Sequence, residues 1–243
     1  MTGVSDCCLL VFVKYPQKGK VKLRLSAALD ENIVQELYRC FVHDTLATAQ
    51  KINAQLRICF LPADKKDKFQ RWLGHHYSFL PQKGSDLGAR MKQCFTDALK
   101  EGFHRVVLIG SDSPDLPAII LQSAFSELQT HEMVLGPSSD GGYYLIGFQD
   151  ISFEPAVFDD IDWSTASVFA QTLQKVHDAQ KNYILLPRWS DVDTLTDLKH
   201  LIKRNGNTSF KSSQTITYLQ QNKILTEDDD ANRGKKKNRN TLA

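Results

Sequence analysis

The stretches VVLIGSDSPDLP (residues 106–117) and MVLGPSSDGGYYLIG (residues 133–147) decide the fold of this 243-residue chain. Each begins as an apolar run of strand length and then reaches an aspartate, Asp112 in the first and Asp140 in the second. An aspartate just beyond the carboxyl end of a buried strand lies on the crevice where α/β proteins bind ligands. The two stretches therefore predict a metal–phosphate or sugar site at one edge of a sheet.

Apolar runs of strand length alternate along the chain with stretches of helical periodicity. Strands are predicted at residues 7–13, 56–61, 106–109, 133–135, 143–147 and 183–186. Helices are predicted at residues 32–51, 86–100, 117–129, 165–176 and 195–202, the last with Thr194 as its N-cap. This alternation predicts a GT-A-like α/β domain with a mostly parallel mixed sheet flanked by helices. The short Gly-rich link between residues 135 and 143 predicts an antiparallel excursion at the sheet edge.

The length fits one folded domain, which we place at residues 1–225. The last stretch, residues 226–243, differs from it. An acidic block at residues 227–230 precedes a basic block at residues 233–239, with almost no apolar residue. Such a segment buries too little apolar surface to offset its ordering entropy. We therefore predict a disordered charged tail.

Composition narrows the class of protein. The 30 basic and 28 acidic residues leave a net charge of +2, which is too weak to argue for a nucleic-acid partner. No run approaches the roughly 18 apolar residues of a membrane span. The five cysteines show no spacing typical of a metal site, and the first strand-length apolar run has no basic segment before it. We expect reduced thiols and a cytoplasmic protein.

The first predicted strand runs into a basic loop. Five cations fall within eleven residues: Lys14, Lys18, Lys20, Lys22 and Arg24. Cations and free backbone amides at this edge of a sheet are suited to polyphosphate recognition. The loop lacks the Walker A and GxGxxG patterns. A solvated basic turn is the alternative interpretation.

Asp112 is the strongest candidate for a site residue. A carboxylate there is suited to hold Mg²⁺ or Mn²⁺ while the metal grips phosphate oxygens. Asp193 follows another predicted strand and is placed to complete that metal site, although a charged helix start is the simpler alternative. Asp115 is a possible second ligand or only a helix-leading residue.

The segment after Asp140 has two interpretations. Gly141 and Gly142 suit a plain turn between strands, and they also let a backbone approach a ligand closely. In the second case Asp140 accepts hydrogen bonds from sugar hydroxyls, next to Tyr143. Further along, Trp163 either stacks on a sugar or base or fills the core.

Several blocks, in order over most of residues 9–198, resemble a family of small bacterial GT-A-type transferases. These are labelled glycosyltransferases and associated with arsenosugar biosynthesis. The carriers are KYP (14–16), GKVK (19–22), RL (24–25), DLG (86–88), RM (90–91), GSDSPDL (110–116), GP (136–137), DGGYY (140–144), WST (163–165) and DVDT (191–194). The resemblance implies a nucleotide-diphospho-sugar transferase fold and a divalent metal.

The resemblance and the residues together predict metal-dependent glycosyl transfer from a nucleotide-activated sugar to a small-molecule acceptor. We expect the donor phosphates on Lys14, Lys20, Lys22, Arg24 and Arg90, and the metal on Asp112 and Asp193. Catalytic roles are expected for Asp112, Asp140 and Lys22, and substrate contacts for Gly141, Gly142, Tyr143 and Trp163.

The basic loop with Asp112 and Asp193 also resembles nucleotidyltransferases such as 2-phospholactate guanylyltransferase and molybdenum-cofactor cytidylyltransferase. This resemblance makes nucleotidyl transfer from an NTP to a phosphorylated or anionic molecule the alternative. A non-catalytic nucleotide-sugar binding module is the third possibility.

Overall fold

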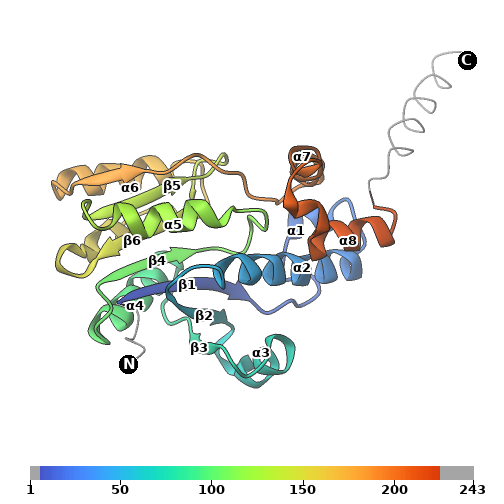
Figure 1. Cartoon of the computed structure of the whole chain (residues 1–243), viewed down its shortest axis with the longest axis horizontal. Coiled ribbons are helices and arrows are strands. Elements are labelled where there is room, and N and C mark those ends of the chain that lie inside the picture. Colours follow the sequence, from blue (N-terminus) through green and yellow to red (C-terminus); the bar gives the residue numbers. More distant parts are fainter. Residues whose placement is uncertain (1–5, 225–243) are drawn as a thin grey trace, which may run out of the picture.

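In the computed structural model, which describes residues 6–224, seven strands form one sheet with helices on both faces (Figure 1). The strands are β1 (Cys7–Lys14), β2 (Gln55–Leu61), β3 (Ser78–Pro81), β4 (Arg105–Ile109), β5 (Met133–Pro137), β6 (Tyr143–Gln149) and β7 (Tyr183–Leu185). Their order across the sheet is β3-β2-β1-β4-β6-β5-β7. All neighbours pair in parallel except β6, which runs antiparallel to both β4 and β5. The predicted mostly parallel mixed α/β sheet is confirmed.

The antiparallel excursion lies elsewhere than predicted. The hairpin between β5 and β6 exists, but β6 inserts between β4 and β5, so it is an interior strand and not an edge strand. Its sequence agrees with this position, because residues 144–148 are all buried. The edges are instead formed by β3, which the sequence reading missed, and β7.

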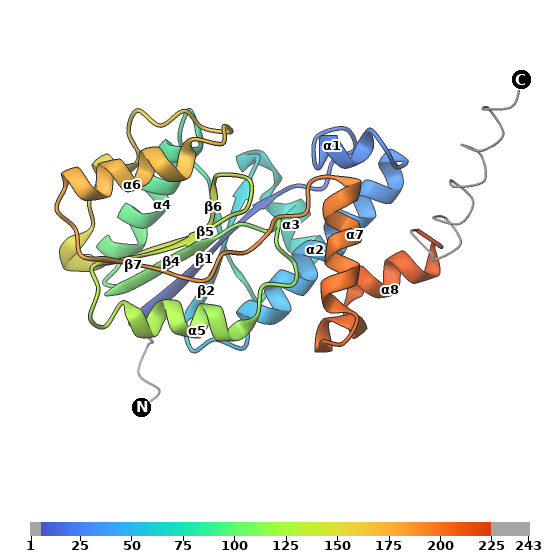
Figure 2. The same cartoon turned by 90° about the horizontal axis from the view of Figure 1, so that it is seen from above.

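Helices cover both faces of the sheet. The α-helices are α1 (Leu23–Ser26), α2 (Glu31–Ala49), α3 (Lys66–Leu73), α4 (Leu87–Lys100), α5 (Ala118–Glu127), α6 (Val168–Asp178), α7 (Leu195–Asn205) and α8 (Gln214–Gln221). Short 3-10 helices lie at Ala63–Lys65, Asp150–Ser152, Pro155–Phe158 and Ser209–Ser212. Figure 2 shows α4 and α6 on one side of the sheet and α2 and α5 on the other.

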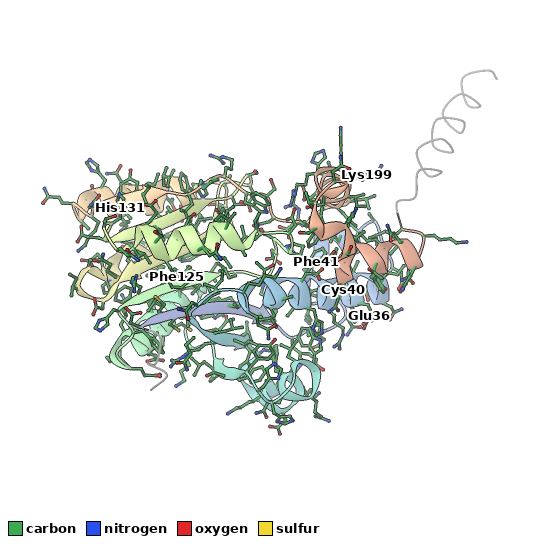
Figure 3. The ribbon with its side chains drawn as sticks, viewed as in Figure 1. Glu36, Cys40, Phe41, Phe125, His131 and Lys199 are labelled. Atoms are coloured by element: carbon green, nitrogen blue, oxygen red, sulfur yellow. The ribbon has the colours of Figure 1, made fainter. Side chains whose placement is uncertain are left out.

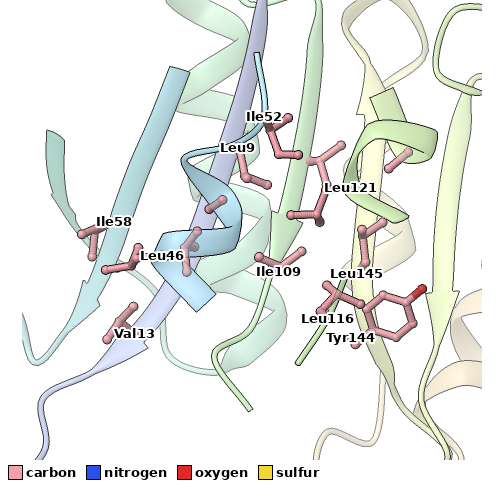
Figure 4. Close-up of a cluster of buried hydrophobic side chains, with 14 of the residues drawn as sticks. Leu9, Val13, Leu46, Ile52, Ile58, Ile109, Leu116, Leu121, Tyr144 and Leu145 are labelled. Carbon is pink, nitrogen blue, oxygen red and sulfur yellow. The ribbon is translucent and has the colours of Figure 1, made fainter. Parts of the chain in front are cut away.

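The alternation of side chains along the strands divides the core between these faces. In β1, Leu9, Val11 and Val13 point into the cluster under α2 and α5 (Figure 4), whereas Cys8 and Leu10 point into the cluster under α4 and α6. Because helices cover both faces of the sheet, nearly all side chains of β1 are apolar and buried.

A third buried cluster lies at one end of the sheet, where α1, α2, α7 and α8 meet (Figure 1). It includes Leu25 of α1, Phe41 of α2, Leu198 of α7 and Leu219 of α8, together with Val192 from the loop before α7. Figure 3 labels Phe41 at this end of the molecule. The cluster therefore fixes the two loops that carry Lys22 and Asp193.

The predicted charged tail, residues 226–243, lies outside the described residues. Within residues 6–224, no helix combines the length and the apolar character needed to cross a membrane.

Candidate functional site

Loops from three strands converge at the carboxyl edge of the sheet. They follow β1, β4 and β7, and backbone hydrogen bonds join the loop after β7 to the loop after β4 and to the end of β5. The Val192 amide donates to the Asp112 carbonyl at 2.9 Å, and the Trp189 amide donates to the Pro137 carbonyl at 3.1 Å. Residues far apart in sequence therefore share one rigid edge.

The ammonium of Lys22 lies between two carboxylates. Its Nζ is 2.5 Å from Oδ1 of Asp112 and 2.8 Å from Oδ1 of Asp193. The Lys22 side chain is 4% exposed, whereas those of Asp112 and Asp193 are 49% and 35% exposed. Burial alone lowers the pKa of Lys22, but the two carboxylates outweigh it and raise that pKa above its ordinary value. Lys22 is therefore a fixed positive charge.

The pair Asp112 and Asp193 fits a divalent cation that arrives with phosphates. Their Oδ1 atoms both touch one nitrogen, so they are close enough to share an ion at the 2.0–2.6 Å ligand distances of Mg²⁺ or Ca²⁺. No group of three or more acidic, histidine or cysteine side chains among the described residues could hold a metal by itself. Mg²⁺ typically takes only one or two carboxylates and completes its shell with substrate phosphates and water.

The other predicted phosphate ligands are spread more widely. Arg24 is 68% exposed, with Nη1 3.9 Å from Oδ2 of Asp193. Lys14, the last residue of β1, and Lys20, on the loop that follows, are both exposed. Arg90 of α4 instead donates to the carbonyls of its own loop, to Gly84 at 3.2 Å and Ser85 at 3.4 Å. The structure thus groups Lys22 and Arg24 with the two aspartates, and Arg90 makes its described hydrogen bonds outside that group.

The turn at Asp140 is built from local contacts. Oδ1 of Asp140 accepts a hydrogen bond from the Gly142 amide at 3.0 Å, and Asp140 itself is exposed. Gly141 has φ 93°, and a Cβ there would lie 2.2 Å from the Ala166 carbonyl oxygen. The close approach that requires glycine at position 141 is therefore to the segment before α6.

Tyr143 and Trp163 pack against each other and against α4. Their ring centroids are 6.5 Å apart at 81°, and the Tyr143 hydroxyl donates to the Met91 sulfur at 3.8 Å. Trp163 lies over Gly88, where a Cβ would come within 2.6 Å of the indole. Burial raises the pKa of Tyr143. Both side chains are partly buried against the α4–α6 core, which is one of the two interpretations given for Trp163.

Asp191 belongs to the DVDT segment, but the sequence pattern assigned it no role of its own. Its Oδ1 accepts a hydrogen bond from the Ser113 hydroxyl at 2.6 Å. Burial raises the pKa of Asp191 to about 6, and the negative charges of Asp112 and Asp140 add to the rise. The sequence did contain a signal for Asp191, because Asp191 and Asp193 stand on either side of the apolar Val192. In the structure the Val192 side chain is fully buried.

Asp115 has a structural role. Its side chain is fully buried and accepts two hydrogen bonds from the Arg204 guanidinium, at 2.6 and 2.7 Å. Asn205 and the Trp189 indole also donate to it, at 2.6 and 3.1 Å. With both oxygens occupied, Asp115 is neither available as a second metal ligand nor the cap of α5, whose N-cap is Pro117, and it ties α7 to the loop after β4.

Comparison with known proteins agrees with this architecture. The family model described as "Uncharacterized protein conserved in bacteria (DUF2064)" matches residues 45–165. Among curated proteins, none matches the chain. A solved structure of a candidate nucleotide-diphospho-sugar transferase from Desulfovibrio desulfuricans G20 is 45% identical, covers 91% of this chain and 97% of its own, and has a TM-score of 0.89.

More distant solved structures share the fold alone. CMP:2-keto-3-deoxy-manno-octonic acid synthetase complexed with CTP has 8% identity, a TM-score of 0.53, and coverage of 83% of this chain and 99% of its own. Rv0371c of Mycobacterium tuberculosis H37Rv, in complex with manganese, has 14% identity, a TM-score of 0.50, and coverage of 82% and 99%. The fold is that of nucleotide-diphospho-sugar transferases and cytidylyltransferases.

Proposed function

This chain belongs to the bacterial family DUF2064, and from that premise and the geometry of the site we propose that it is a metal-dependent glycosyltransferase using a nucleotide-activated sugar. The observation that carries the proposal is the convergence of Asp112 and Asp193 beside the basic loop after β1. Two carboxylates close enough to share an ion, next to several cations, match the charge pattern of a metal–diphosphate complex.

The proposed division of labour follows the placement of the residues. Lys14, Lys20, Lys22 and Arg24 lie on one loop or at its end, where they would face the donor phosphates. Asp112 and Asp193 would hold Mg²⁺ or Mn²⁺, which supplies charge neutralisation for the departing diphosphate. The manganese complex of the distant neighbour Rv0371c supports the choice of metal. Asp140, exposed at the same edge, would accept hydrogen bonds from the sugar or take the acceptor proton.

Nucleotidyl transfer from an NTP is the second candidate. It is favoured by the density of cations in the segment from Lys14 to Arg24, which suits a triphosphate, and by the CTP complex of the synthetase that shares this fold. In that reaction the same metal and lysines would neutralise the departing pyrophosphate, and no protein base is needed.

A donor screen followed by product analysis separates the two reactions. Thermal shifts are measured with nucleoside triphosphates and nucleotide-sugars, each with and without Mn²⁺ or Mg²⁺. The stabilising donors are then incubated with acceptor candidates, among them compounds related to arsenosugars. Release of a nucleoside diphosphate from a nucleotide-sugar supports glycosyl transfer. Stabilisation by NTPs alone, with pyrophosphate released when an acceptor is added, contradicts it.

The same screen tests the metal site through Asp112. We expect Asp112→Asn to abolish metal-dependent donor binding, because the amide removes one of two charged ligands. Asp178→Asn on α6 is the matched control, since it makes the same chemical change at an exposed carboxylate outside the site. If metal-dependent stabilisation survives in Asp112→Asn, the site is misplaced.

A further inference from the structure

The Lys22 ammonium contacts both proposed metal ligands, Asp112 and Asp193, from the interior side of the site. Its side chain is buried under two carboxylates whose outer sides are open to solvent. The Nζ atom also lies 5.8 Å from the centre of the Phe41 ring, within the cation–π range. Lys22 has a left-handed backbone, φ 47° and ψ 49°, directly before α1. The third core cluster, through Leu25 and Phe41, fixes this position.

In this geometry the Lys22 ammonium and a metal ion on the same two carboxylates would repel each other electrostatically. A cation bound to the same two oxygens at 2.0–2.6 Å would lie within about 5 Å of Nζ, since both would touch the same atoms. A single and a double positive charge at that separation repel each other. In the protein without donor, Lys22 already neutralises part of the charge that would attract the metal.

Donor phosphates change this balance in two ways. Their oxygens supply further ligands to the metal, and they offer the Lys22 ammonium another anionic partner. Metal and donor should therefore each strengthen the binding of the other by the same factor, as thermodynamic linkage requires.

We propose that Lys22 is a positioning residue that makes metal binding conditional on the donor, because its ammonium acts as the resident counter-ion of Asp112 and Asp193. This inference rests on the proposed function, since it requires a metal–donor complex. It differs from a simple phosphate-binding role for Lys22, which predicts no gain in affinity for the metal alone. It also differs from a purely structural clamp, whose loss would weaken metal binding.

The sign of one substitution distinguishes these roles. Mn²⁺ alone is titrated into the full-length protein, with free Mn²⁺ followed by electron paramagnetic resonance. We expect Lys22→Met to bind Mn²⁺ about tenfold more tightly than the wild type, the effect of removing a unit charge about 5 Å from a divalent one even in water. Lys18→Met removes a charge from the same loop outside the ion pair and should leave Mn²⁺ affinity unchanged. Equal or weaker binding by Lys22→Met overturns the proposal.

A measurement on the unsubstituted protein covers the case in which Lys22→Met does not fold. Mn²⁺ is titrated into the unsubstituted protein with and without each nucleotide or nucleotide-sugar that stabilises it in the donor screen, with protein-free donor solutions as blanks. We expect the donor to tighten Mn²⁺ binding by at least about fivefold. Mn²⁺ affinity that is the same with and without donor overturns the proposal.

The proposed function fails separately from this inference. If the wild type binds Mn²⁺ in the presence of the nucleotides and nucleotide-sugars of the donor screen, but Lys22→Met gains no affinity for Mn²⁺ alone, only the role of Lys22 is wrong. If neither protein binds Mn²⁺ under any of these conditions, both proposals are wrong.

Discussion

Asp191 shows how a half-buried carboxylate is affected by the electrostatics of the site. The negative charges of Asp112 and Asp140 act on it, and it accepts a hydrogen bond from the Ser113 hydroxyl. Asp193, two residues later, has the Lys22 ammonium as partner. Asp191 and Asp193 therefore differ in the charges around them, because Asp193 pairs directly with a lysine, whereas Asp191 accepts its hydrogen bond from a neutral hydroxyl.

The raised pKa of Asp191 predicts a pH-dependent gain in stability for Asp191→Asn. The folded-state pKa is about 6 and the ordinary value is near 3.8, so the folded protein binds the extra proton between these values. The ionised carboxylate thus destabilises the fold progressively from about pH 4 to about pH 6, and fully above that. We expect Asp191→Asn, which keeps an acceptor for Ser113, to be more stable above pH 6 by up to about 3 kcal/mol.

Urea unfolding between pH 4 and 8, without divalent metal, measures this difference. The gain should vanish towards pH 4, where Asp191 is protonated in both states. Asp178→Asn, at an exposed carboxylate, should show a nearly flat difference across the range. An Asp191→Asn protein that is less stable than the wild type at pH 8 would show that the carboxylate is well solvated or paired.

At the scale of elements, the long periodic segments were predictable and the short ones were not. The helix predicted at residues 32–51 is α2, and the strand predicted at residues 7–13 is β1. The sequence reading missed α1, which has four residues, and β3, a four-residue strand that ends in proline. Such segments are too short for a period of 3.6 or 2 to show, and tertiary contacts decide their conformation.

The N-cap of α7 was also predictable from the sequence. Thr194 was predicted as the N-cap of the helix after the DVD segment, and the structure confirms it with a full capping box. The Thr194 side chain accepts from the Asp197 amide at 3.2 Å, and the Asp197 carboxylate accepts from the Thr194 amide at 2.8 Å. Asp197 also accepts from the Asp193 amide at 3.2 Å, so the cap holds the backbone of a proposed metal ligand.

Thr194→Ala should therefore affect both stability and the site. Loss of the cap is expected to cost about 1 kcal/mol of unfolding free energy, as measured by urea denaturation. We also expect weaker Mn²⁺ binding in the presence of donor, because Asp193 loses part of its backbone support. Thr196→Ala, on the exposed side of α7, is the control and should change neither quantity. Unchanged stability in Thr194→Ala would mean that water replaces the cap without cost.

At the scale of the whole molecule, the site depends on contacts that a sequence pattern does not encode. Strand ends placed Asp112 and Asp193 on one edge, because carboxyl ends of parallel strands meet there. The pairing of Lys22 with Asp193, 171 residues apart, depends on how α1 and α7 pack at the end of the sheet. Periodicity predicts that α7 exists, but it predicts neither α1 nor which ends of the elements meet.

The third core cluster should consequently control both global stability and the site. Leu219 of α8 is 2% exposed and packs in the cluster that also holds Leu25 and Val192. Leu25 is three residues beyond Lys22, and Val192 directly precedes Asp193. We expect Leu219→Ala to cost about 2–5 kcal/mol of unfolding free energy through the cavity it leaves. We also expect the loosened cluster to reduce the thermal stabilisation given by Mn²⁺ with donor.

The matched control for this prediction is Ile151→Ala, because Ile151 is 89% exposed and its truncation should change stability by no more than about 0.5 kcal/mol. Urea and thermal unfolding followed by two probes, tryptophan fluorescence and far-ultraviolet circular dichroism, report whether α7 and α8 unfold with the sheet. Since the cluster contacts α2, which packs along the sheet, we expect one coincident transition in the wild type and in Leu219→Ala. A separate early transition that leaves the ligand stabilisation intact would show that this end of the molecule is independent of the site.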